Sequence, residues 1–275
     1  MHHRALAPYG PALSRGGSAV RCSDMSATTA LAIFGAGFVA GTVNTIVGSG
    51  SLITFPTLLA VGYSPVVANV SNTVGLVPGT LSGTIGYRRE LEGQRRRAAT
   101  LGLACVAGGA TGAALLLVLP GSVFRRVVPV LILVACALVV AQPRLNRLLA
   151  ARHPEDARHG GAGLFVTVFA TAVYGGYFGA AQGVILIALL AIFLPDDLQH
   201  LNAVKNVLAL MVNGVAALIF IALTHVAWAA AGLVAAGSLP GGALGAVIGR
   251  RLNPGVLRAA IVVVGLAVAI DLLVG

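Results

Sequence analysis

The feature that most constrains this chain is a long stretch without formal charge. No Asp, Glu, Lys or Arg occurs anywhere from Met25 to Tyr87. A helix needs only about 20 apolar residues to cross the hydrocarbon core of a bilayer. The stretch is therefore long enough for several crossings, and we predict that the chain folds back on itself inside a membrane.

The rest of the composition supports the same class. Hydrophobic residues make up 57% of the chain and charged residues 9%, whereas soluble domains are about 25% charged. From Gly160 to Gly249 the only formal charges are Asp196, Asp197 and Lys205, which leaves room for about four crossings. Because the apolar runs are continuous and do not alternate, a β-barrel is disfavoured. We predict an all-α, polytopic transmembrane helical protein.

The net charge of +10 gathers in short segments between apolar runs. Such clusters follow the positive-inside rule for cytoplasmic loops, and no basic stripe alternates with base-stacking aromatics, which argues against nucleic-acid binding. We expect a multi-pass protein of the bacterial plasma (inner) membrane. The arginines concerned are Arg88, Arg89, Arg95, Arg96, Arg97, Arg144, Arg147, Arg152, Arg158, Arg250, Arg251 and Arg258.

The chain divides into an extension and two halves. Residues 1–26 are rich in Pro, Gly, Ser and Arg and lack the apolar centre of a signal peptide, so we expect a disordered N-terminal extension, with translation of the native protein starting at Met25. A first transmembrane repeat is expected at 27–142, a cytoplasmic linker at 143–162 and a second transmembrane repeat at 163–275.

Glycine and proline breaks divide the two halves into ten helical segments. Five segments is an odd number, so the second half enters the membrane in the opposite direction, which is the plan of an inverted repeat. Two short segments, 51–62 and 183–194, reach only about 18 Å, against a core of about 30 Å, and are predicted as interrupted or re-entrant short helices. The expected segments are 27–47, 51–62, 65–87, 98–119, 123–142, 163–182, 183–194, 198–223, 226–249 and 255–274.

The two halves share a motif order with one difference in charge. The run NTIVGSGSLITFP is followed by ANVSNTVGLVPG, and GGYFGAAQGVILIALL is followed by LNAVKNVLALMVNG. Lys205, the only lysine, occupies the position in the second half that is equivalent to Asn72 in the first. We call the sequence separation between these two residues the repeat offset. A charge inside an apolar segment is costly and indicates a functional site.

These runs resemble the sulfite exporter TauE/SafE family of membrane permeases. The first block is GTVNTIVGSGSLITFPTLLAVGYSPVVANVSNTVGLVPGTLSGTIGYRREL, and the second is YGGYFGAAQGVILIALL with LNAVKNVLAL and GSLPGGALGAVIGRRL. The family's three consecutive glycines are replaced by Gly48, Ser49, Gly50 and Ser51, and by Ala180, Ala181, Gln182 and Gly183. The resemblance covers about 27–274 and implies a secondary carrier for small anions, often sulfur-containing, such as sulfite or organosulfonates, usually in export.

The residues themselves predict an anion site at the glycine breaks. Helix N-termini there present unpaired N–H groups and positive dipole ends, serine and glutamine side chains add donors, and Lys205 adds a positive charge. Three alternatives remain open: the glycines serve only close helix packing, Lys205 extends toward the interface, and the asparagines only link helices. The predicted substrate-binding residues are Asn44, Thr45, Gly48, Ser49, Gly50, Ser51, Asn69, Asn72, Gln182, Gly183, Asn202, Lys205 and Asn206.

Other functions find little support in the sequence. Three scattered cysteines form neither a disulfide framework nor a zinc motif, and no nucleophile–base spacing or nucleotide-binding loop occurs. We therefore expect no enzyme activity, catalytic residue, metal or cofactor. The expected partners are the lipid bilayer and a small anionic substrate; proton coupling, the oligomeric state, and an importer, a channel-like pore or an accessory subunit without carrier activity stay open.

Overall fold

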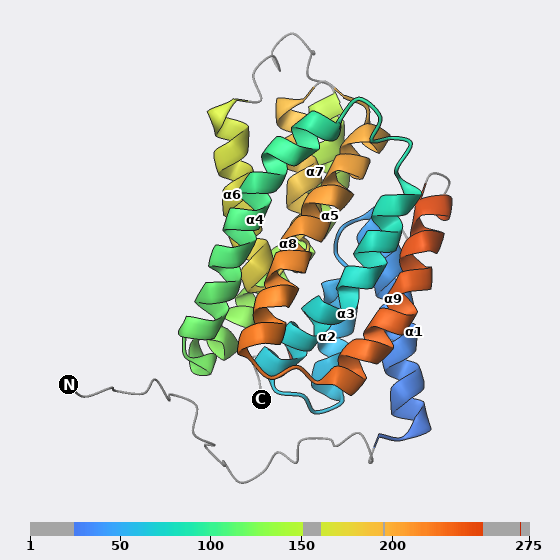
Figure 1. Cartoon of the computed structure of the whole chain (residues 1–275), viewed down its shortest axis with the longest axis vertical. Coiled ribbons are helices and arrows are strands. Elements are labelled where there is room, and N and C mark those ends of the chain that lie inside the picture. Colours follow the sequence, from blue (N-terminus) through green and yellow to red (C-terminus); the bar gives the residue numbers. More distant parts are fainter. Residues whose placement is uncertain (1–24, 151–160, 195, 250–269, 271–275) are drawn as a thin grey trace, which may run out of the picture.

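The computed structural model describes residues 25–150, 161–194, 196–249 and 270. Within these ranges the chain forms nine helices and no strand, which confirms the all-α prediction (Figure 1). The expected segment 255–274, apart from residue 270, and residues 1–24 of the extension lie outside the described residues. The helices are α1 (Ala27–Ile46), α2 (Ser51–Ala60), α3 (Pro65–Gly86), α4 (Arg95–Val118), α5 (Gly121–Ala150), α6 (Ala162–Tyr177), α7 (Gln182–Phe193), α8 (Leu198–Leu223) and α9 (Trp228–Ile248).

Local sequence signals explain the helix ends in the first half. The Ser26 side chain accepts a hydrogen bond from the Thr29 amide and caps α1. α1 ends where Gly48 adopts a φ of +85°, a conformation that glycine reaches without a steric penalty. Pro65 stands at the first position of α3, where its missing N–H costs nothing. The short helix α2 spans about 15 Å, too little to cross a bilayer.

The second half breaks earlier than the sequence predicted. The expected segment 163–182 ends at Tyr177, because Gly179 and Ala181 take φ values of +75° and +57° that a right-handed helix does not allow. Gln182 therefore begins the next helix, α7, and is not the end of α6. Asp197 caps α8 through a bond from the Gln199 amide.

One helix from each sequence half packs against helices of the other half. α9, from the second half, packs along α1 and α3, whereas α4, from the first half, packs along α6 and α8. Figure 1 shows these two groups side by side, with α1 and α9 on the right and α4 and α6 on the left. Small residues make the contacts close: a Cβ on Gly241 would overlap the backbone of Phe38, and one on Gly112 the backbone of Val173.

Five of the described helices are long and apolar enough to cross a membrane: α1, α4, the Gly121–Ala141 part of α5, α8 and α9. The segment 88–97 leads into the start of α4, at the upper end of the bundle in Figure 1, where α5 and α9 also end. The remaining arginine-rich segments continue from those two helices. The start of α4, which contains Arg95, Arg96 and Arg97, therefore lies at this end, and the arginines of 151–160 and 250–258 lie outside the described residues.

Candidate functional site

The two glycine breaks touch each other. The backbone N–H of Gly183 donates a hydrogen bond of 3.0 Å to the carbonyl oxygen of Gly48. A Cβ on either glycine would overlap the backbone of the other, so the contact requires glycine at both positions. The short helices α2 and α7 both begin beside this crossing, and the sequence-predicted residues of the two halves meet there.

Lys205 is buried at the end of α1. Its side chain has no exposed surface, and its ammonium donates to the carbonyl oxygens of Asn44 and Thr45 at 3.3 and 3.1 Å. This position excludes the alternative in which the side chain extends to the interface. Among the described residues no acidic side chain forms an ion pair with Lys205.

Two asparagines of α8 point at the same carbonyl group. The side-chain amides of Asn202 and Asn206 each lie 3.4 Å from the Thr45 oxygen. A carbonyl oxygen has two lone pairs, so three donors crowd it and the two longer bonds are weak. The last carbonyls of a helix carry partial negative charge, which explains why donors gather there. A lysine ammonium has three N–H donors, and these bonds use two.

α3 makes a related contact with α6. The Asn69 side-chain amide donates to the Tyr177 carbonyl, in the last residue of α6, at 3.0 Å. Asn202 follows Asn69 by the repeat offset, and Tyr177 follows Asn44 by the same separation. In each half, therefore, an asparagine of the third helix binds the end of the other half's first helix.

Asn72 has different partners from Lys205. Its amide donates to the Ser51 hydroxyl at 3.0 Å, and its oxygen accepts a short hydrogen bond from Thr54. Asn72 therefore joins α3 to α2 in its own half, whereas Lys205 reaches the other half. Asn44 is held by the Thr80 hydroxyl, to which its amide donates at 3.1 Å.

Several buried polar atoms around the crossing have no hydrogen-bond partner within the described ranges. Four of them occupy equivalent positions in the two halves, one repeat offset apart in the sequence: Ser49 Oγ and Gln182 Nε2, and Asn69 Oδ1 and Asn202 Oδ1. An unpaired buried polar group costs about 1–3 kcal/mol, and in native proteins it calls for an explanation. Because unpartnered atoms occur at equivalent positions in both halves, they are a feature of the repeated architecture and not an isolated defect.

The beginnings of the short helices are also uncapped. The cap residues are Gly50 before α2 and Ala181 before α7, and neither has a side chain that can accept a hydrogen bond from the first turn. The N–H groups of Leu52 and Ile53 in α2, and all four in the first turn of α7, donate to nearby backbone carbonyls. What each short helix directs at the crossing region is therefore the positive end of its dipole. No acidic residue occurs in α1, α2, α3, α6 or α7. Lys205, the unpartnered donors of Ser49 and Gln182 and the positive dipole ends together suit an anion.

The structure adds two participants that sequence reasoning missed. Thr54 binds Asn72, and Tyr177 offers its carbonyl to Asn69. The repeat offset relates Tyr177 to Asn44 and could have found it. Nothing comparable marks Thr54, because its position one helical turn after Ser51 matters only once α2 is known to pack on α3. In the described part of the chain no group of metal-binding side chains occurs.

A comparison of the whole sequence with known families settles the assignment. The profile described as sulfite exporter TauE/SafE matches residues 33–272. The chain belongs to the sulfite exporter TauE/SafE family. This membership makes it a multi-pass membrane transporter, in agreement with the resemblance that its motifs carry. The match spans both glycine breaks and the Lys205 helix.

Individual relatives agree with a membrane transporter. The probable membrane transporter protein YfcA of Escherichia coli K12 is 27% identical over 252 residues, covering 88% of each chain. A probable membrane transporter protein of Haemophilus influenzae is 26% identical, covering 84% of this chain and 89% of the relative. Another from Sinorhizobium is 33% identical over 106 residues, 38% of this chain and 40% of the relative. No solved structure gives a significant match.

Proposed function

We propose that this transporter is a secondary carrier that exports a small anion by alternating access, with a sulfur-containing anion such as sulfite or an organosulfonate as the substrate. The observation that supports this most directly is Lys205, a fully buried cation without an acidic partner in the described ranges, beside the crossing of two glycine breaks.

Electrostatics favours an anion at this place. Removing an ammonium from water costs several kcal/mol unless a counter-charge or hydrogen bonds compensate it. The two carbonyl groups of α1 supply partial compensation, and a monoanion would supply the rest. Gln182 Nε2 and Ser49 Oγ, both without a partner among the described residues, are the donors we assign to the anion's oxygens.

The exchanged helices support alternating access. α1 packs on α9 and α4 on α6, so each group contains helices from both sequence halves. If the halves are inverted repeats, as their motif order predicts, rocking of one group against the other would expose the crossing first to one side and then to the other. The contact between Gly48 and Gly183 lies where such groups would pivot.

The choice of a sulfur anion rests on the family description. A trigonal sulfite or a sulfonate presents three acceptor oxygens, which suits the three side chains of Lys205, Gln182 and Ser49 beside the positive ends of the α2 and α7 dipoles. The names of the relatives in Escherichia coli and Haemophilus influenzae specify a membrane transporter and no substrate.

Transport by purified protein in liposomes tests the proposal. The panel contains sulfite, a sulfonate, sulfate and a carboxylate, and saturable flux with counterflow exchange of sulfite or the sulfonate is expected. Non-saturable flux without counterflow would identify a channel-like pore. Movement of the carboxylate alone would favour an importer of organic anions, and no movement of any anion would favour an accessory subunit. In oriented vesicles, the preferred direction separates export from uptake.

A further inference from the structure

A pocket lies away from the glycine breaks, at the start of α4. Its walls come from the start of α4, from Leu164 of α6 and from Leu194 after α7. Its volume is about 420 Å³, within the range of roughly 300–1,000 Å³ for small-molecule sites. The residues that line it at and just before the start of α4 are Gly93, Gln94, Arg96, Arg97, Thr100 and Leu101.

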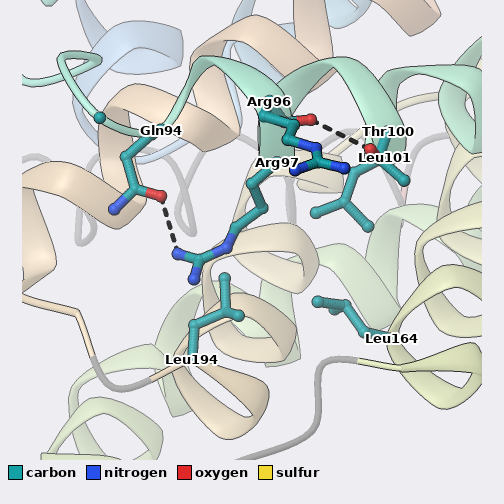
Figure 2. A pocket seen from close by; sticks show the side chains of 8 residues that line it. Gln94, Arg96, Arg97, Thr100, Leu101, Leu164 and Leu194 are labelled. Carbon is teal, nitrogen blue, oxygen red and sulfur yellow. Dashed lines mark hydrogen bonds between the residues drawn. The ribbon is translucent and has the colours of Figure 1, made fainter.

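The lining combines cationic and apolar groups. Figure 2 shows the Arg97 guanidinium between Gln94 and Leu194, with Leu164 across the pocket. Leu101 and Leu164 are buried members of the hydrophobic core between α4, α6, α7 and α8. A ligand in this pocket therefore meets charge at one side and hydrocarbon at the other, which suits an amphiphile better than a small hydrophilic ion.

The charges around the pocket are not balanced. Arg97 donates to Gln94 at 2.7 Å and forms an ion pair with Asp196. Arg96 forms no ion pair among the described residues, and the first turn of α4 contains three arginines and no acidic residue. Cations at a helix N-terminus are disfavoured by its dipole, so a bound anion would relieve this arrangement.

We propose that this pocket binds the phosphate of an anionic membrane lipid. Arg96 and Arg97 bind the phosphate oxygens, a pairing that the planar guanidinium favours, while Leu101, Leu164 and Leu194 contact the glycerol and the first methylene groups. The pocket lies at the start of α4, in the arginine-rich segment 88–97, and the cytoplasmic leaflet has a negative surface potential that attracts such clusters.

Binding of the full-length protein to defined lipids tests this site. Native mass spectrometry measures how much phosphatidylglycerol or phosphatidylcholine each variant retains. The wild type is expected to retain phosphatidylglycerol in preference to phosphatidylcholine. Arg96→Gln is expected to lower the affinity for phosphatidylglycerol about tenfold, because one charge-assisted bond to phosphate is lost. Asp196→Asn is expected to raise it, since Arg97 is then freed from its ion pair.

Two further variants separate this pocket from general surface charge. Arg89→Gln removes the same charge from an exposed arginine that does not line the pocket, and it is expected to leave lipid retention unchanged. Leu164→Gln changes no charge and is expected to weaken retention by making the apolar wall polar. Thermal unfolding of each variant shows whether it is folded.

Three results would overturn the proposal. The first is equal retention of phosphatidylglycerol and phosphatidylcholine. The second is an equal loss for Arg89→Gln and Arg96→Gln, which would indicate diffuse attraction to the basic surface. The third is stabilisation by inorganic phosphate, with loss of that effect in Arg96→Gln and no lipid retention, which would make the pocket a site for a soluble anion.

Discussion

The end of α1 and the end of α6 occupy equivalent places in the two halves, yet they are bound differently. The Thr45 carbonyl of α1 accepts from Lys205, Asn202 and Asn206 of α8. The Tyr177 carbonyl of α6 accepts from Asn69 of α3 alone among the side-chain donors in the described ranges. Both helix ends bind an asparagine of the other half, whereas only the end of α1 also binds a lysine and so has a positive charge beside it.

In this site the residues that join the helices can therefore be distinguished from the residue that carries the charge. Asn69 and Asn202 each use the amide nitrogen for the other half's first helix and leave the oxygen without a partner in the described ranges. Asn72 has both its polar atoms bonded to α2. Lys205 has one N–H beyond the two that bind the α1 carbonyls. On this basis the α1 end is where we expect the anion, and the α6 end is its neutral counterpart.

The largest effect is expected from the contact that joins the two breaks. Gly48→Ala places a methyl group against the Gly183 backbone and forces an unfavourable φ, so a loss of stability above about 3 kcal/mol is expected. Thermal unfolding in detergent measures it. Gly62→Ala is the matched control, because its φ is +102° but nothing lies within 4 Å; only about 1–2 kcal/mol is expected there. Equal losses would show that the crossing is loosely packed.

The next effect concerns the charge that distinguishes the α1 end. Lys205→Met keeps the length and apolar bulk of the side chain and removes the cation. Transport efficiency, kcat/KM, is expected to fall about 10- to 100-fold, because a hydrogen bond to a charged group contributes about 1.5–3 kcal/mol. Flux in liposomes measures this. Asn72→Leu, at the equivalent position, serves as the comparison and is expected to lower transport less; the reverse order would place the anion at the α2 side.

A smaller effect is expected from the paired asparagines. Asn202→Ala and Asn69→Ala each remove one interhelical hydrogen bond, worth about 0.6 kcal/mol on average in membranes. The unfolding temperature is expected to fall slightly in both variants, and more for Asn69→Ala, whose bond is the shorter. Only Asn202→Ala is expected to raise the KM for the anion, by about threefold, because Asn202 shares the Thr45 carbonyl with Lys205. Equal KM values for the two variants would remove the distinction between the two ends.

The smallest effect is expected from Thr54, which supports Asn72 without belonging to either helix end. Thr54→Val is close in shape and removes the hydroxyl that donates to Asn72. A loss of about 1 kcal/mol in stability is expected, with transport within about twofold of wild type. Unfolding and flux measurements on the same preparation check it, and a transport loss as large as that of Lys205→Met would bring α2 into the substrate site.

Most of the fold was predictable because membrane segments follow simple length and polarity rules. The uncharged stretch from Met25 to Tyr87 and the arginine clusters predicted several crossings and one arginine-rich end. The end of α6 was predicted wrongly, at residue 182 where the structure has Tyr177. Glycine alone marks a break only approximately, and the left-handed conformation of Ala181 has no signal in its side chain.

The sequence predicted a set of site residues, but it could not predict which of them contact one another. All the residues chosen from the sequence lie at the ends or beginnings of helices that surround the crossing, or on α3 and α8. Their roles as substrate contacts stay predictions. The repeat offset made Lys205 and Asn72 equivalent in the sequence, whereas the structure joins Lys205 to α1 and Asn72 to α2, since a sequence offset defines equivalence and not contact.

Sequence alone was sufficient to define the class of this protein: a membrane transporter of the TauE/SafE family with two glycine-broken halves and a single lysine in an apolar segment. It was sufficient because hydrophobic length, loop charge and motif order are local properties of the chain. Tertiary packing was needed to establish that α4 and α9 exchange partners, that Gly48 touches Gly183 and that Lys205 lies on the α1 carbonyls. Those contacts join residues far apart in the chain, and close packing in three dimensions selects them.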